Sequence, residues 1–361
     1  GGNLIMDGEA ALDITAAGAP GTDHDLVTVT GDLTLSGMLN LSATADLSAL
    51  AEDTEITLFS VDGAAVSGTF SGLSEGSFVD VGGSVFQISY AGGDGNDVTL
   101  TSLGALRGNV GVDGDGDLVI TESGSTAGTD DSLTISVGAD RYTITSTSGA
   151  LTTDIPGGIR VDENTIEVPF TELAGDEIRV QTGDGTDNLT LDLSGGLLNR
   201  TLIFMGGAGT GDILTINNGN FVNTVTHDLT GSDAGNIDLD GDNVADIQYT
   251  GLEPVDMSGS TISNLVFNRP DVVNNAELVD TGGGMLTLRS TDASPTFEET
   301  TFLAPSGTVT INGGSNTDTV TVSSAAGLTL NGALSVTAEA IELDGALTAG
   351  GDVTLNGSTS V

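Results

Sequence analysis

Residues 328–357 read LTLNGALSVTAEAIELDGALTAGGDVTLNG, and this stretch decides the fold. It opens on LTLNG and closes on VTLNG, so apolar side chains alternate with threonine or asparagine before each glycine. Alternation with a period of two is typical of a strand with one buried face, and Asn-Gly is a strong turn signal. The stretch predicts short strands joined by sharp corners, with Leu328, Leu330, Val353 and Leu355 pointing inward.

The same phrase returns elsewhere in the chain. It reads LTLSG, LTINNG and VTING at residues 33–37, 214–219 and 309–313. The last three copies begin at residues 309, 328 and 353, which are 19 and 25 residues apart. Periods of this size are typical of solenoids with one coil per repeat. We therefore predict an all-β chain folded as a parallel β-helix (β-solenoid), with Asn312, Asn331 and Asn356 stacked as a hydrogen-bonded ladder.

The middle of the chain is less regular. Residues 104–200 repeat least and contain Pro156 and the pair Pro169-Phe170, so a less regular β insertion is the alternative there. A string of β-sandwiches is the other all-β reading, but it needs hairpins and usually buried aromatics, and aromatic residues make up only 4% of the chain. We divide the chain into a solenoid module (1–103), a Gly/Asp-rich β module (104–258) and β-helix repeats (259–361).

Composition restricts the possible partners. The chain has 52 acidic and seven basic residues, giving a formal net charge of −45, which argues against binding nucleic acid or anionic lipid surfaces. It has no cysteine, so no disulfide stabilises it, and it has no run of 18 apolar residues that would span a membrane. The chain starts at Gly1-Gly2 and stops at Val361 within the repeating pattern, so we expect a segment of a longer polypeptide.

Four stretches resemble a known class of proteins. Residues 20–41 and 56–101, the latter ending in ISYAGGDGNDVTLT, are similar to the autotransporter-associated β-strand module of giant bacterial surface proteins. Residues 236–254, NIDLDGDNVADIQYTGLEP, resemble another phrase of such proteins, and residues 328–357 resemble filamentous-haemagglutinin-like β-helix repeats. The resemblance implies a β-solenoid exposed at the cell surface, in an adhesin, a coat or a filament. It implies no catalytic residue.

Gly-Asp-rich turns are the candidate metal sites. Residues 92–100 (GGDGNDVTL), 182–190 (TGDGTDNLT) and 313–321 (GGSNTDTVT) approach the calcium-binding nonapeptide G-G-x-G-x-D-x-U-x. The candidate Ca²⁺ ligands in the first two are Asp94, Asn96, Asp97, Asp184 and Asp187. Such a site needs consecutive copies that share the ion, and these copies lie far apart in sequence. The alternative is a plain corner, in which glycine supplies the geometry and aspartate the solubility.

A second acidic motif has the form D-x-D-G-D-x-x-x-D. Its candidate Ca²⁺ ligands are Asp238, Asp240, Asp242 and Asp246. The spacing partly follows an EF-hand loop, but the glycine is misplaced and no twelfth-position glutamate follows, so a solvated turn is the alternative. Asp113, Asp115 and Asp117 form a shorter version. The two histidines, His24 and His227, form no metal-binding spacing, and we expect both in surface turns.

These observations favour a structural, non-enzymatic function. We expect an extracellular solenoid segment at the cell surface, stacked end to end with same-type chains or with adjacent repeats. The alternative function is a β-helix polysaccharide-degrading enzyme, but a lyase acting on acidic glycans needs clustered basic groups, and the seven arginines are scattered. Ice binding through Thr-x-Thr pairs is a remote third hypothesis because their spacing is irregular.

Overall fold

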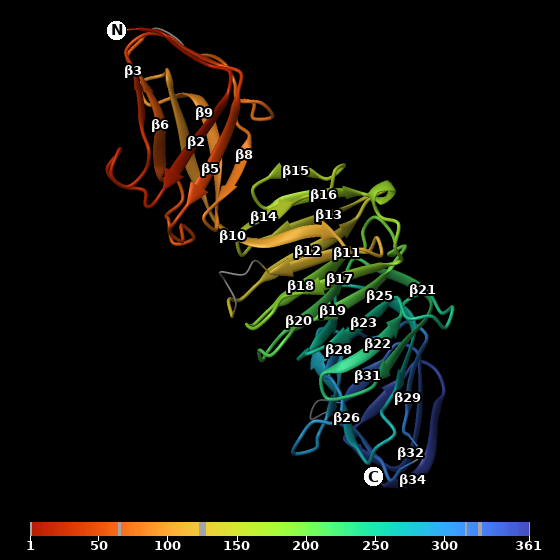
Figure 1. Ribbon diagram of the computed structural model, residues 1–361. Coiled ribbons are helices and arrows are strands. Elements are labelled where there is room, and N and C mark those ends of the chain that lie inside the picture. The colour runs from red at the N-terminus through yellow and green to blue at the C-terminus, as the bar shows by residue number, and fades with distance from the viewer. Residues whose placement is uncertain (1, 64–65, 123–127, 315, 324–326, 361) are drawn as a thin grey trace.

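The structure is a computed structural model that describes residues 2–63, 66–122, 128–314, 316–323 and 327–360. The molecule is elongated, and its two termini lie at opposite ends (Figure 1). The regular elements of the described residues are strands, apart from the 3-10 turn η1 (Phe170–Glu172). The all-β prediction is confirmed. Within these ranges we find no helix with the length and apolar character needed to cross a membrane.

The N-terminal part consists of parallel stacks followed by antiparallel strands. Its strands are β1 (Leu4–Met6), β2 (Glu9–Ile14), β3 (Val27–Val29), β4 (Leu33–Leu35), β5 (Met38–Ala43), β6 (Glu55–Val61), β7 (Val66–Gly68), β8 (Phe78–Val81) and β9 (Ser84–Gly92). Three parallel stacks form here: β1–β4–β7, β2–β5 and β3–β6. The strands β4, β5 and β6 therefore pair, in the same order, with β1, β2 and β3. Leu33 and Leu35 point into the core between the stacks because alternate side chains of a strand face opposite sides.

A long strand, β10 (Asp97–Val112), connects the N-terminal part to the rest of the molecule. Its first half pairs antiparallel with β6 and β9, and its second half pairs with β11 (Leu118–Glu122) and β14 (Ala150–Thr153). The buried apolar residues form two clusters, one within residues 10–100 and the other within residues 110–341. The core therefore changes along β10, while the second cluster continues through residue 258 without a break.

The central part combines parallel stacks with an antiparallel group. Its remaining strands are β12 (Ser132–Val137), β13 (Arg141–Ser146), β15 (Ile159–Asp162), β16 (Thr165–Pro169), β17 (Glu177–Gln181), β18 (Asn188–Asp192), β19 (Thr201–Met205) and β20 (Ile213–Asn217). β11, β17 and β19 form one parallel stack, and β12, β18 and β20 form another. β13 pairs antiparallel with β12 and β16, and β15 with β16. This antiparallel group falls where the sequence repeats least.

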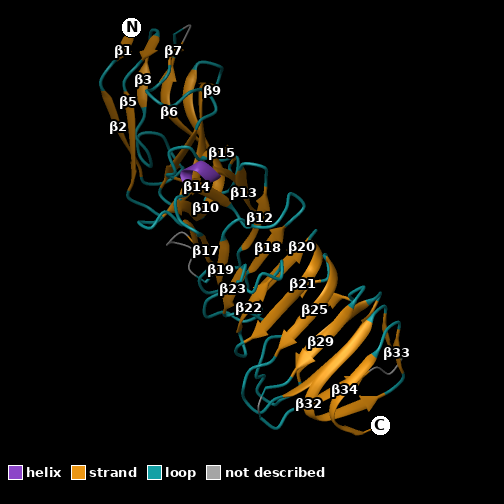
Figure 2. Ribbon diagram, turned by 90° about the vertical axis from the view of Figure 1, so that its right-hand side faces the viewer, coloured by secondary structure: helices purple, strands orange, loops and turns teal. Residues whose placement is uncertain are grey.

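The C-terminal part continues the stacks. Its strands are β21 (Asn220–Leu229), β22 (Ala234–Asp238), β23 (Ile247–Thr250), β24 (Val255–Met257), β25 (Thr261–Asn268), β26 (Asn275–Gly282), β27 (Met285–Ser290), β28 (Thr300–Leu303), β29 (Thr308–Asn312), β30 (Thr319–Ser323), β31 (Leu328–Leu330), β32 (Ala333–Asp344), β33 (Leu347–Ala349) and β34 (Val353–Ser360). β21, β25, β29, β32 and β34 pair in parallel and lie side by side in Figure 2. β23 stacks on β19, and β24 and then β28 stack on β20.

The interval between aligned residues varies along the stacks. Leu328 aligns with Leu347, 19 residues later, whereas Leu265 aligns with Val309, 44 residues later. The longer interval contains β27, which pairs antiparallel with both β26 and β28. Inserted hairpins therefore lengthen some intervals well beyond the 19 and 25 residues that the repeated phrase indicates.

Copies of the repeated phrase do not share one face. Leu328 and Leu330 are buried, as predicted, but they belong to the separate two-stranded sheet β31–β33. Val353 aligns with Leu334 on another stack and is 43% exposed, so the prediction of one inward row for all four residues is wrong. Two copies of the phrase reach the same strand stack only when the number of residues between them equals the interval between aligned residues at that place. This interval is not constant along the chain.

An asparagine ladder exists, but with different members. Asn268, Asn312, Thr337 and Asn356 align across β25, β29, β32 and β34. The Asn312 side-chain amide donates to Asn268 Oδ1 over 2.8 Å, and that of Asn356 donates to Thr337 Oγ1 over 3.5 Å. Asn331 follows β31 and takes no place in this column, so its inclusion was wrong.

Candidate functional site

The acidic motif at residues 238–246 forms the loop between β22 and β23. Carboxylate oxygens of Asp238, Asp240 and Asp246 lie within 4.8 Å of one another. Asp238 accepts N–H groups of its own loop, from Gly241 over 2.7 Å and from Asn243 over 2.9 Å. Burial and the neighbouring carboxylates raise the pKa of Asp246 to about 6. The loop brings three of the four predicted ligands together, and its own backbone amides already satisfy Asp238.

Asp242 and the shorter acidic motif serve their own turns. Asp242 Oδ1 accepts the Val244 N–H over 2.7 Å and is not part of the group of three. In the shorter motif, the Arg179 guanidinium lies 3.1 Å from Asp113 and 3.2 Å from Asp117. The positive charge beside Asp113 and Asp117 is therefore an arginine of the same chain.

The first nonapeptide forms the hairpin turn between β9 and β10. Asp97 Oδ1 accepts the Val61 N–H over 2.8 Å, and the Asn96 amide donates to the Gly63 carbonyl over 2.6 Å. Asp94 is exposed at the tip. Two of the three predicted ligands in this turn therefore attach it to the end of β6.

The second nonapeptide lies in a stack of similar turns. Asp187 immediately precedes β18, and the register places it between Asp131, before β12, and Asp212, before β20. Asp187 Oδ1 accepts the Asp131 N–H over 2.7 Å, and the Asp187 N–H donates to Asp212 Oδ1 over 2.8 Å. Turns that are far apart in sequence thus become direct neighbours in the fold.

The sequence analysis missed Asp131 and Asp212, although a signal for both exists. The phrases TDDSLTI, TDNLTL and TGDILTI begin at residues 129, 186 and 210, each with an aspartate just before a strand. The third predicted nonapeptide, GGSNTDTVT, follows the same form and places Asp318 before β30; its Ser315 lies outside the described residues. The phrase therefore identifies the turns in which an aspartate directly precedes a stacked strand.

Asp131, Asp187 and Asp212 form a column of acidic residues along the stacked turns, and this acidic column continues beyond Asp212. Leu214 aligns with Val255 and Val255 with Thr300, so the register places Glu253 and Glu298 in line with Asp212. Desolvation is the main cause that raises the pKa of Glu298 to about 8, against an ordinary 4.5, and the Glu253 charge adds to it. Desolvation also raises the pKa of Asp131 to about 6. Burial along this column therefore disfavours the charged carboxylates.

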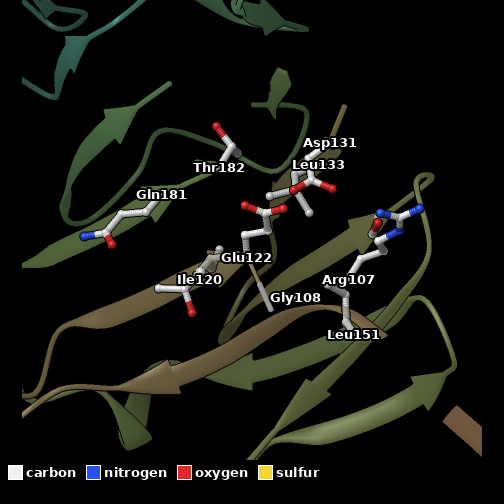
Figure 3. Close-up of a pocket in the computed structure, with 11 residues that line it drawn as sticks. Arg107, Gly108, Ile120, Glu122, Asp131, Leu133, Leu151, Gln181 and Thr182 are labelled. Carbon is white, nitrogen blue, oxygen red and sulfur yellow. The ribbon is translucent and has the colours of Figure 1, made fainter. Parts of the chain in front are cut away.

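Hollows near the column differ in size. A cavity of about 10 Å³, with room for roughly one water molecule, lies at its N-terminal end. The side chains of Arg107, Glu122 and Asp131 gather around this cavity (Figure 3). A surface hollow of about 520 Å³ lies at the other end, lined by Glu253, Glu298 and Arg289 among others. Of these two hollows, the second is large enough for a small organic ligand and the first is not.

The histidines are not in surface turns. His227 is fully buried, with Nε2 2.7 Å from the Tyr249 hydroxyl and Nδ1 3.2 Å from Thr300 Oγ1. Desolvation lowers the His227 pKa to about 3, so the ring is neutral. His24 is also buried. The surface prediction was wrong for both, for different reasons. His227 lies in β21, and its partners Tyr249 and Thr300 are distant in sequence. His24 lies between β2 and β3, where it bridges the nearby residues Ile14 and Pro20 and is covered by its own segment.

Comparison with known proteins gives no relative. No protein-family model, curated protein or solved structure matches this chain.

Proposed function

We propose that this chain is a parallel β-helix (β-solenoid) segment of a large extracellular bacterial surface protein, where it acts without catalysis as an adhesin stalk, coat or filament. The observation that carries the proposal is the parallel, in-register pairing of β21, β25, β29, β32 and β34. Stacking of this kind builds a rod in which each coil contacts mainly its neighbours. A rod of this kind spans distance and displays a surface.

Charge and sequence resemblance support the extracellular location. A net charge of −45 keeps such a rod soluble and repels other polyanions. Residues 20–41 and 56–101 resemble modules of giant surface proteins, and residues 328–357 resemble adhesin-type β-helix repeats. These likenesses point to the same setting and to no catalytic residue.

The partner we propose is another coil of the same type, from an adjacent repeat or a second chain. Among the described strands, β34 pairs only with β32, and β2 pairs only with β5. A strand paired on one side presents free N–H and C=O groups to a further strand. A head-to-tail contact between such ends does not close, so it extends into a fibre.

The test is end-to-end assembly at high protein concentration, measured by sedimentation and by electron microscopy. The double variant T354K/S358K places lysines on β34, where edge charges oppose strand addition. The control T230K/T329K adds the same charge at exposed positions outside β34. We expect the wild type and the control to form linear oligomers, and the β34 variant to remain monomeric. A wild type that stays monomeric at every concentration would contradict the proposed end contact.

One observation favours the enzymatic alternative. Glu253 and Glu298 line the same 520 Å³ hollow, and Glu298, with a pKa of about 8, holds a proton at neutral pH. A protonated and an ionised carboxyl group flanking a sugar are the requirement for glycosidic bond cleavage. A panel of neutral and acidic glycans should be assayed with the wild type and with E298Q. Cleavage that E298Q abolishes would replace the structural proposal, and a lack of cleavage by the wild type supports it.

A further inference from the structure

The turns that precede β18 and β20 form a corner that buries two carboxylate groups, and strand stacking provides a hydrogen bond for only one oxygen of each. Asp187 and Asp212 are each only 1% exposed. Stacking uses one oxygen of each, since Oδ1 of Asp187 accepts the Asp131 N–H and Oδ1 of Asp212 accepts the Asp187 N–H. The Oδ2 atoms of both are buried and accept no hydrogen bond of good geometry within the described residues, although the Thr182 hydroxyl lies near the Asp187 carboxylate. A buried, unsatisfied carboxylate oxygen is costly, which points to a missing ligand.

Further oxygens gather at the same corner. A Cβ atom built on Gly206 would lie 2.8 Å from Asp212 Oδ2 and 2.2 Å from the Gly251 carbonyl oxygen, so both oxygens crowd this glycine. The Gly206 carbonyl oxygen in turn lies 3.4 Å from Oγ1 of the buried Thr182. Asp212 Oδ2 and the Gly251 carbonyl oxygen therefore lie against the same residue, Gly206, whose own carbonyl accepts from Thr182 in the neighbouring turn.

Glycine is required for this close approach of the turns. A Cβ on Gly207, whose φ is +100°, would lie 1.5 Å from the Gly183 carbonyl oxygen. A Cβ on Gly209 would lie 1.7 Å from the Gly185 carbonyl oxygen. The Gly-rich turns at residues 182–187 and 206–212 thus pack backbone on backbone, with their aspartates side by side.

We propose that this corner binds one hard divalent cation of the calcium class, with Oδ2 of Asp187 and Oδ2 of Asp212 as its charged ligands. Ca²⁺ takes oxygen ligands at about 2.3–2.6 Å. Aligned residues on adjacent parallel strands lie about 4.8 Å apart, so one ion between two such carboxylates reaches both. Thr182 Oγ1 and the carbonyl oxygens of Gly206 and Gly251 are the nearby neutral ligands.

The charge balance supports a cation here. No arginine of the described residues forms an ion pair with Asp187 or Asp212. The comparable corner at Asp318 has Arg269 Nη2 3.8 Å from its carboxylate. A bound cation would balance the buried carboxylates of Asp187 and Asp212, as Arg269 does at Asp318.

The test is calcium binding by the full chain. The protein is freed of metal with a chelator and titrated calorimetrically with Ca²⁺, then with Mg²⁺, in 0.5 M NaCl to suppress nonspecific screening. We expect saturable binding with a Kd of roughly 10⁻⁵–10⁻³ M, preference for Ca²⁺ and a rise in melting temperature. D187N/D212N, which keeps Oδ1 as an acceptor, should weaken Ca²⁺ binding at least tenfold.

Two control variants give the test its specificity. D344N removes one exposed carboxylate, and D238N/D240N disables the acidic loop between β22 and β23; we expect both to keep the wild-type Ca²⁺ affinity at this corner. Absence of saturable Ca²⁺ binding by the wild type, or wild-type affinity in a folded D187N/D212N, overturns the proposal. Should D187N/D212N fail to fold, Tb³⁺ located by anomalous diffraction in the wild type decides: Tb³⁺ between Asp187 and Asp212 supports the site, and Tb³⁺ only elsewhere overturns it.

Discussion

The corners at Asp187 and at Asp318 share a backbone arrangement and differ in how their charge is balanced. At each, one carboxylate oxygen accepts the N–H of the residue aligned before the neighbouring strand, Asp131 over 2.7 Å and Asn274 over 3.0 Å. Each aspartate N–H donates in turn to a carboxylate on the next layer of the stack. The acceptor for Asp187 is Asp212, which precedes β20, and the acceptor for Asp318 is Glu339, which lies within β32. Stacking therefore fixes one oxygen of each aspartate in the same way.

The second oxygen is treated differently at the two corners. Asp318 Oδ2 accepts the Gly314 N–H over 2.9 Å and lies near the buried Arg269. Asp187 Oδ2 is buried, accepts no backbone N–H and has no cationic side chain beside it in the described part of the chain; the nearby group is the neutral Thr182 hydroxyl. Neighbouring residues thus decide whether an internal arginine lies beside the second oxygen, as at Asp318, or whether that oxygen is left for the cation that we propose at Asp187. The predictions below probe this difference.

The largest effect is expected from removing the internal cation. R269M leaves Asp318 buried without its partner, and breaking a buried ion pair in this way costs about 3–5 kcal/mol. The side chains of Arg269 and Asp318 are both 0% exposed, so solvent does not screen the loss. Chemical denaturation of wild type and R269M measures the change. An effect below about 1 kcal/mol would show that Asp318 needs no internal cation.

A second effect depends on pH and tests the far end of the acidic column. Glu298 has a folded-state pKa of about 8, above its ordinary 4.5, so the folded protein binds its proton more tightly than the unfolded chain. Its contribution to stability is full below pH 4.5 and is lost as the pH rises through 8. E298Q removes this loss and should raise the free energy of unfolding at pH 9 by roughly 2–4 kcal/mol relative to wild type. Equal stability of the two proteins at both pH 5 and pH 9 would contradict the burial argument.

The third prediction concerns Asp212 without calcium. D212N keeps the acceptor for the Asp187 N–H and removes a buried charge that no arginine balances. In chelator we expect D212N to be more stable than wild type by about 1–2 kcal/mol, because an uncompensated buried charge is destabilising. In saturating Ca²⁺ the order should reverse. Thermal melting in both buffers measures the effect, and the same order in both would count against a bound ion.

The smallest effect is expected for an exposed pair. Arg289 Nη2 lies 2.6 Å from Glu277 Oε2, and the arginine side chain is 47% exposed. R289M should cost no more than about 1 kcal/mol, because solvent and salt screen surface pairs. It is the matched control for R269M, and a loss as large as that of R269M would mean that burial does not set the difference.

The sequence alone determined the local structure of this protein. Alternation such as LTL at residues 328–330 placed strands with one buried face, and Gly-Asp phrases such as TGDGTD placed their corners. These features depend only on neighbouring residues, so they were visible without the fold. The same reasoning found Asp187 and the loop containing Asp238.

The tertiary structure alone decided which segments meet. Asp187 lies between Asp131 and Asp212, which are 56 and 25 residues away, and His227 is buried against Tyr249 and Thr300. Strand partners depend on how many residues separate two strands that pair in parallel, and inserted hairpins such as β26–β27 change that number. Because pairing is non-local, similar phrases reach different faces, and dissimilar residues such as Thr337 and Asn356 share a column.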